Sequence, residues 1–328
     1  MKQRTFGRTG KTVSEIGFGA WAIGGAWGDV SKEDAKAALH ASLDAGTTFI
    51  DTADVYGDGR SEQLIAEVLK ERGGDKPYVA TKLGRRVSPH VAEGFTRANL
   101  TAFVERSLVN LQTDCLDLIQ LHCPPPAVYY QQEVFGFMDD LVAAGKIRHY
   151  GVSVEKVEEA LKAIEFPNVQ SIQIIYNIFR QRPARLFFAE AKKRQVGVIA
   201  RVPLASGLLT GKMNAATAFA ADDHRAFNRN GEAFDKGETF SGVPYDVALD
   251  VVEEIRRLVP EQQSMAEFAL RWILMEDAVS TVIPGARNAQ QAQSNSRASD
   301  APALSTETMA ALRDIYAKRI AQYVHHNW

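Results

Sequence analysis

The chain is poor in cysteine and has no long apolar run. Its two cysteines, Cys115 and Cys123, would stand about 26 Å apart on one extended strand, at roughly 3.3 Å per residue, which is too far for a disulfide. Neither has partners at metal-ligand spacing, so no metal site is expected. No apolar run approaches a membrane span, and the N-terminal MKQRTFGRTG lacks the apolar core of a signal peptide. We therefore expect a cytoplasmic protein without membrane insertion.

The sequence also lacks an excess of charge of either sign. The sequence carries 38 basic and 40 acidic residues, for a net charge of −2. No basic block is interleaved with aromatic residues, which disfavours a nucleic-acid partner. The hydrophobic share of 45% is ordinary for a globular protein.

The glycine-rich signatures of nucleotide-binding folds are also absent. Gly17-Phe18-Gly19 followed by Gly24-Gly25 lacks the third glycine at the offset that a dinucleotide-binding turn needs. A phosphate-loop reading of Gly10-Lys11-Thr12 fails because no glycine stands five positions before Gly10. A doubly wound open sheet is therefore the less favoured of two arrangements for an alternating chain.

Short apolar runs do alternate with amphipathic segments along nearly the whole chain. The amphipathic segments, such as 33–44, 61–72, 97–111 and 134–144, have helical spacing of their apolar residues. Eight repeats of this alternation predict a (β/α)8 TIM barrel. The eight expected strands are 16–19, 48–51, 78–82, 116–122, 149–153, 171–176, 197–202 and 281–284.

The chain is longer than a minimal barrel, which takes roughly 250 residues. The 328 residues leave room for three additions to a single domain spanning 1–328. TFGRTGKTV predicts an N-terminal β-hairpin cap under the barrel, and 306–323 predicts an extra C-terminal helix. The long, glycine-punctuated segment 214–243 is expected to be a loop or lid over the barrel mouth.

Four polar residues stand at or just after the ends of three expected strands. Asp51, Lys82 and His122 each close an apolar run, and Tyr56 follows Asp51. In a parallel barrel this rim carries the active site. An ammonium beside a phenol stabilises the phenolate, an aspartate holds the ammonium, and an imidazole orients a carbonyl oxygen. Such a set suits proton donation to oxygen while a second group delivers hydride.

The sequence resembles the aldo-keto reductase superfamily in a series of segments that follow the family's order over positions 3–300. It is most similar to a soluble bacterial branch with GAWAIGG near the start and IPGxR near the end. The resemblance implies reversible NAD(P)H-dependent reduction of small aldehydes or ketones. It makes Tyr56 the general acid and completes the catalytic set with Asp51, Lys82 and His122. The matching segments are FIDTADVYGDGRSEQLIAEVL, VATKLG, DLIQLHCPP, YGVS, IQIIYNIFRQ, PLASGLLTGK and IPGARNAQQAQSN.

The resemblance also implies where a dinucleotide would bind. Ser153 and Gln173 match positions that hydrogen-bond the nicotinamide carboxamide, and Asn295 matches a position that contacts adenine. The pyrophosphate-binding loop corresponds to PLASGLLTGK, with Leu204, Ser206, Leu208 and Lys212.

Two positions depart from the family pattern. Arg201 stands where many members have a tyrosine that stacks on the nicotinamide, so Arg201, Trp21 or Tyr176 is expected to supply this surface. Gly285 and Gln291 stand where many relatives have a lysine and an arginine, which leaves Arg287 as the expected ligand of a 2′-phosphate. NADP(H) is therefore favoured, with use of NAD(H) as the alternative.

A second function stays open beside the reductase. Potassium-channel β subunits of the same superfamily keep the catalytic set but serve mainly as cofactor-binding regulatory modules, and the site motifs do not separate the two. The physiological carbonyl or polyol, the favoured direction and a homo-oligomeric state are not specified by the sequence.

Overall fold

Eight parallel strands make up the central sheet of the structure, a computed structural model that describes residues 1–25, 27–28 and 30–328. The order of hydrogen-bonded neighbours is β10-β9-β8-β7-β6-β5-β4-β3. Each strand therefore pairs with the next along the chain, as the sequence alternation predicts. The strands are β3 (Phe18–Gly19), β4 (Phe49–Asp51), β5 (Tyr78–Leu83), β6 (Leu116–His122), β7 (Ile147–Ser153), β8 (Val169–Ile175), β9 (Gly197–Arg201) and β10 (Thr281–Val282).

The sheet closes on itself where its first and last strands meet. The amide of Gly17 donates to the Val282 carbonyl at 2.8 Å, and the amide of Gly19 donates to the Pro284 carbonyl at 3.0 Å. A Cβ on Gly19 would lie 2.6 Å from the Ile283 carbonyl oxygen, so only glycine permits this approach. These contacts confirm a barrel rather than an open sheet.

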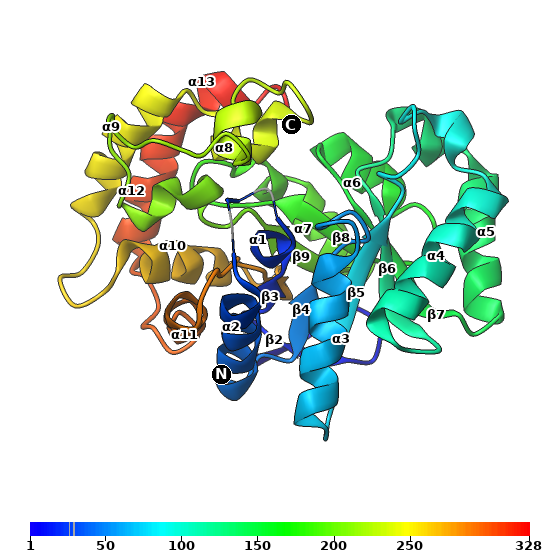
Figure 1. Ribbon diagram of the computed structural model, residues 1–328. Coiled ribbons are helices and arrows are strands. Elements are labelled where there is room, and N and C mark those ends of the chain that lie inside the picture. The colour runs from blue at the N-terminus through cyan, green and yellow to red at the C-terminus, as the bar shows by residue number, and fades with distance from the viewer. Residues whose placement is uncertain (26, 29) are drawn as a thin grey trace.

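Helices surround the barrel on its outer side (Figure 1). Several begin at a side-chain cap: Ser31, Thr96, Ser264 and Asn288 each accept a hydrogen bond from a backbone amide of the first turn. The longer helices are α2 (Lys32–Asp44), α3 (Arg60–Arg72), α4 (Arg97–Leu111), α5 (Gln132–Ala143), α6 (Val157–Ala163), α7 (Phe187–Lys193), α9 (Tyr245–Arg256), α10 (Met265–Leu274), α11 (Ala289–Arg297) and α12 (Thr306–Ile315).

The N-terminal hairpin plugs one end of the barrel. Strands β1 (Gln3–Thr5) and β2 (Thr12–Ser14) pair antiparallel, and the turn between them carries Phe6, which is fully buried. The Phe6 ring lies 5.4 Å from the ring of Phe49 and 5.8 Å from that of Tyr78. These two residues begin β4 and β5, so the predicted cap lies at the N-terminal end of the strands.

The segment 214–243 covers the opposite end of the barrel and is more structured than the predicted loop. It contains the short helix α8 (His224–Phe227) and two 3-10 turns, Lys236–Glu238 and Phe240–Gly242. The short helix α13 (Ala321–Val324) follows α12 after a π-helical turn at Tyr316–Ile320. The indole nitrogen of Trp328 donates to Asp235 at 2.8 Å. The residues after α12 therefore help to hold this segment on the barrel.

Among the described residues, no helix combines the length and apolar character needed to span a bilayer.

Candidate active site

A buried ion pair forms the centre of the site. The ammonium of Lys82, on β5, is inaccessible to solvent and donates to Asp51 Oδ2 at 2.6 Å and to the Thr52 carbonyl at 2.8 Å. A third contact reaches the Tyr56 hydroxyl at 3.3 Å. A buried charge is tolerated only when it is paired and hydrogen-bonded, and Lys82 meets both conditions.

Two glutamines complete the surroundings of Asp51. The side-chain amide of Gln173, on β8, donates to Asp51 Oδ1 at 2.7 Å, and that of Gln120, on β6, donates to the same oxygen at 3.2 Å. Gln120 was not identified from the sequence. It stands two positions before His122, and residues two apart share a face of a strand. This spacing could have identified Gln120 from the sequence.

The pKa of Tyr56 lies above its ordinary value. Burial raises it, and the attraction of Lys82 offsets that effect only in part. The sequence-based expectation gave more weight to the ammonium. Burial alone would lower the pKa of Lys82, but Asp51 and Tyr56 more than compensate, so this pKa is raised. Near neutral pH the phenol therefore keeps its proton beside a charged ammonium.

His122 lies against Tyr56 at the end of β6. The two ring centroids are 6.0 Å apart at an interplanar angle of 84°. Burial, followed by the charges of Arg85 and Lys82, holds the pKa of His122 well below its ordinary value. The imidazole is therefore neutral and can donate one N–H to an oxygen atom. Its Nδ1 is buried and has no hydrogen-bond partner among the described residues.

An aromatic wall borders the Tyr56 phenol. Trp21, in the short helix α1 (Trp21–Gly24), lies nearly parallel to Tyr56 with ring centroids 6.0 Å apart. The Trp21 ring also contacts Trp27 at 5.4 Å and His224 of the covering segment at 4.8 Å. Trp21 thus joins the site to the segment above it.

Tyr176 is placed elsewhere. Its ring packs against Phe188 at 4.8 Å and Trp272 at 4.9 Å, which belong to α7 and α10. The structure therefore does not bring Tyr176 to the candidate catalytic residues, and Trp21 and Arg201 remain the candidates for a surface beside a nicotinamide.

Ser153 and Gln173 lie level with His122 in the barrel. In the strand register Ser153 is paired with His122 on one side and with Gln173 on the other. Three neighbouring strands thus present hydrogen-bonding side chains at one height.

Arg201 ends β9 and is buried in an ionic cluster that sequence reasoning missed. Its guanidinium donates to Glu238 at 2.5 Å and to the Val154 carbonyl at 2.9 Å. The Cys123 thiol and the carboxylates of Glu155 and Glu238 lie within 4.8 Å of one another, a spacing that would suit a metal ion. Each carboxylate, however, is paired with an arginine. The expected absence of a metal stays a prediction.

The loop expected to bind pyrophosphate forms the 3-10 turn Ala205–Thr210 after Leu204. Ser206 has a positive φ of 55°; its hydroxyl donates to the Glu238 carbonyl at 3.0 Å and accepts from the Phe240 amide at 3.1 Å. Leu208 is buried in the core, whereas Lys212 is exposed. Ser206 therefore ties this loop to the covering segment, and Lys212 presents a charge to solvent.

The four remaining candidates, Gly285, Arg287, Gln291 and Asn295, lie in α11 and in the loop that precedes it. The Arg287 amide donates to Gln291 Oε1 at 2.9 Å, and the Asn295 side-chain amide donates to the Gly285 carbonyl at 3.1 Å. A Cβ on Gly28 would lie 3.7 Å from the Arg287 guanidinium. Arg287 therefore lies between α11 and the loop after α1, beside the positive end of a helix dipole.

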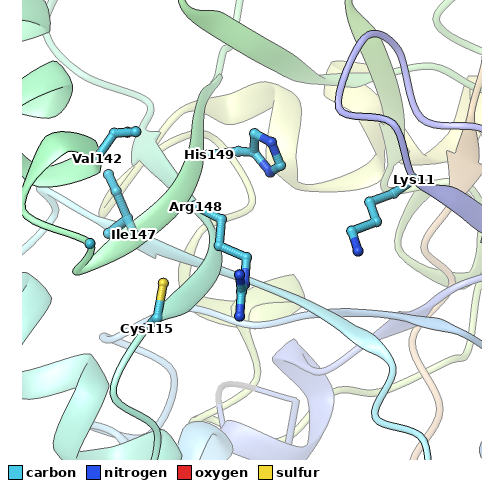
Figure 2. A pocket seen from close by; sticks show the side chains of 7 residues that line it. Lys11, Cys115, Val142, Ile147, Arg148 and His149 are labelled. Carbon is cyan, nitrogen blue, oxygen red and sulfur yellow. The ribbon is translucent and has the colours of Figure 1, made fainter.

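A hollow at the other end of the barrel contains none of these residues. Figure 2 shows Lys11 of the hairpin facing Arg148 and His149 across it. Arg148 and His149 stand at the start of β7, and Ser153 stands at its end, so strand β7 separates this hollow from the site.

Comparison with known proteins gives consistent matches over nearly the whole chain. A model of the aldo/keto reductase family matches residues 15–317. The chain is 33% identical over 296 residues to aldo-keto reductase YhdN of Bacillus subtilis, covering 89% of this chain and 86% of that protein. It is 28% identical to a probable voltage-gated potassium channel subunit beta of Oryza sativa, covering 94% of each. The solved glycerol dehydrogenase AKR11B4 of Gluconobacter oxydans superposes with a TM-score of 0.79 at 30% identity, covering 97% of this chain and 96% of that one.

Proposed function

Because this chain belongs to the aldo/keto reductase family, we propose that it catalyses the reversible NAD(P)H-dependent reduction of aldehydes or ketones to alcohols. One observation carries the proposal. The ends of β4, β5 and β6 bring a protonated phenol, a buried ammonium paired with Asp51 and a neutral imidazole to one point of the barrel mouth.

Tyr56 is the proton donor in this proposal. Its raised pKa keeps the hydroxyl protonated, and the adjacent Lys82 ammonium stabilises the phenolate that remains after the proton passes to the carbonyl oxygen. His122 donates its N–H to the same oxygen and orients the carbonyl. Asp51 holds Lys82 charged and in place, and Gln120 and Gln173 hold Asp51.

The residues around the mouth fit a nicotinamide dinucleotide. A bound nicotinamide supplies the hydride. Ser153 and Gln173 lie at the height of His122 and are proposed to orient the carboxamide, and Trp21 or Arg201 is proposed to lie beside the ring. Buried donors that have no partner among the described residues, such as Arg201 Nε, could hydrogen-bond to a bound cofactor. The other proposed cofactor contacts are Leu204, Ser206, Leu208, Lys212, Gly285, Arg287, Gln291 and Asn295.

We propose NADP(H) as the preferred cofactor and NAD(H) as the alternative. Arg287 carries a bidentate guanidinium next to the α11 N-terminus, a combination that favours a phosphate. The cytoplasmic location, the absence of a nucleic-acid partner, a single domain over 1–328 and a homo-oligomeric state remain predictions from the sequence.

The test is consumption of NADPH and NADH by the purified protein with short aldehydes, ketones, dicarbonyls and ketoses, followed at 340 nm beside fluorescence titration of each cofactor. Turnover above about 1 s⁻¹, where typical kcat values begin, would support an enzyme. Failure to bind either nucleotide would refute the proposal.

The similarity to a probable channel subunit keeps a second candidate in view. That likeness covers 94% of both chains, and the catalytic residues do not separate a reductase from a cofactor-binding regulatory module. Tight binding of NADPH with negligible turnover over the whole panel would favour the module.

A further inference from the structure

A second arginine, Arg85, lies at the barrel mouth beside the catalytic residues. It follows Lys82 by three positions, just past the end of β5. Its charge is the first among those that depress the pKa of His122, ahead of that of Lys82. Its ion-pair partner Glu155 lies within 4.8 Å of the thiol of Cys123, which follows His122 in the chain, so the guanidinium lies in the same part of the mouth as His122.

The guanidinium of Arg85 is only partly satisfied. Glu155, two positions after the end of β7, pairs with Nη2 at 3.1 Å, while the neighbouring Nε is buried and has no partner among the described residues. Nε and Nη2 form one edge of the planar fork that matches a carboxylate with two parallel hydrogen bonds. Glu155 thus occupies one arm of the fork and leaves the other open.

Other polar groups at this place also have unused donors. Arg201 Nε and the Tyr129 hydroxyl are buried without partners among the described residues, and Arg201 and Tyr129 are 7% and 1% exposed. Unmet buried donors carry a desolvation cost, which an entering group with acceptor oxygens would relieve.

We propose that Arg85 binds the carboxylate of an oxo-acid substrate and releases Glu155 when it does so. The inference rests on the proposed reductase function and narrows its substrate class to carbonyl compounds that carry a carboxylate. A phosphate ester also offers oxygens that the fork can bind in pairs, so the experiment compares the two groups. Glu155 is then a positioning residue that competes with the substrate for Arg85.

The protonation state of Glu155 sets the strength of this competition. Burial, followed by repulsion from Asp235 and Glu238, raises its pKa to about 7. Below that pH Glu155 is neutral and Arg85 is available, whereas an oxo-acid with a carboxyl pKa of about 4 stays ionised. The groups that face Glu155 from the surrounding elements are Arg85, Cys123, Tyr129, Glu159, Arg180, Arg201, Asp235 and Glu238.

The experiment compares ω-oxo carboxylates of increasing chain length with their methyl esters as substrates of the intact protein with NADPH. The readout is the ratio of kcat/KM for acid over ester. Arg85→Met should lower this ratio by roughly tenfold or more, the value of a hydrogen bond to a charged group. Glu155→Gln should raise it. Arg148→Met removes an exposed ion pair with Asp117 at the far end of the barrel and should leave the ratio unchanged.

The opposite signs separate this proposal from a purely structural ion pair. A brace between the loops after β5 and β7 would respond in the same direction to loss of either partner, and that outcome would overturn the proposal. The KM for the acid should also fall as pH drops through about 7, and Glu155→Gln should abolish this dependence. The ester controls for other groups that titrate there.

Two further results of the substrate comparison would decide against parts of the proposal. The same ratio of kcat/KM can be measured for an aldehyde phosphate over the corresponding unphosphorylated hydroxyaldehyde. If this ratio depends on Arg85 more strongly than the ratio of oxo-acid over ester, the choice of carboxylate is overturned. Good turnover of the esters with no preference for acids would refute this inference and leave the reductase function intact, whereas no turnover of either would refute the function itself.

Discussion

Asp54→Asn should stabilise the protein, and more so as pH rises. Asp54 lies two positions before Tyr56 and is fully buried, with no hydrogen-bond partner for either side-chain oxygen among the described residues. Burial, followed by repulsion from Glu62, raises its pKa from 3.8 to about 7. Asparagine keeps the size of the side chain and removes the charge.

The magnitude follows from proton linkage. The folded state holds the Asp54 proton over the range from about 3.8 to about 7, where the unfolded state releases it. Stability therefore falls as pH rises through this range, by an amount that approaches about 4 kcal/mol above pH 7, at 1.36 kcal/mol for each pKa unit. Because asparagine has no such dependence, the gain from Asp54→Asn should be small near pH 4 and reach its limit above pH 7.

Denaturant unfolding of both proteins at several pH values, with midpoints converted to free energies, measures this gain. Asp58→Asn is the matched control, since Asp58 is exposed and its ion pairs with Arg86 and Arg106 lower its pKa; this change should destabilise slightly or not at all. A gain from Asp54→Asn that is constant over pH would show that Asp54 is not held protonated by burial.

Three further substitutions test the site. Tyr56→Phe should reduce turnover by a factor on the order of 10² to 10⁴, the usual contribution of a general acid, while NADPH fluorescence titration stays unchanged; full activity would remove Tyr56 from its role. Arg287→Ala should weaken NADPH far more than NADH in the same titration, with the exposed Arg297→Ala as control, and equal weakening would remove Arg287 from the 2′-phosphate. Lys82→Met should lower the unfolding free energy by about 3 to 5 kcal/mol, because it leaves a buried Asp51 without its partner; a loss below about 1 kcal/mol in denaturant unfolding would contradict the buried pair.

The sequence predicted the strands and the meeting of the candidate catalytic residues because both follow from local patterns. Short apolar runs mark the strands, and the barrel rule sends the residues that end them to one rim. Asp51, Lys82 and His122 meet there without further information. The same periodicity could have excluded Tyr176. Gln173 faces the barrel interior, and a residue three positions later points to the opposite face of the strand, toward the helices.

The ionic cluster at the mouth could not be predicted in this way. Arg85, Glu155 and Glu238 come from three connections far apart in the chain, and none of them has a local pattern that names its partner. The segment 214–243 was predicted as a loop because its composition favours one. Its short helices are held by distant residues such as Arg201 and Trp328, which local propensity does not include.

The joint between the first and last strands of the barrel determines where the sheet opens locally. Strands β3 and β10 have two residues each and meet through a few backbone hydrogen bonds, so this joint has the least to lose when the sheet opens. The loops that leave it carry Trp21 on one side and Arg287 on the other. A dinucleotide that contacted both loops would stabilise the closed joint, and its affinity would appear as a lower population of the state in which the first and last strands are open. Cofactor binding and local unfolding of these two strands would then be thermodynamically linked, so that each could be measured through the other.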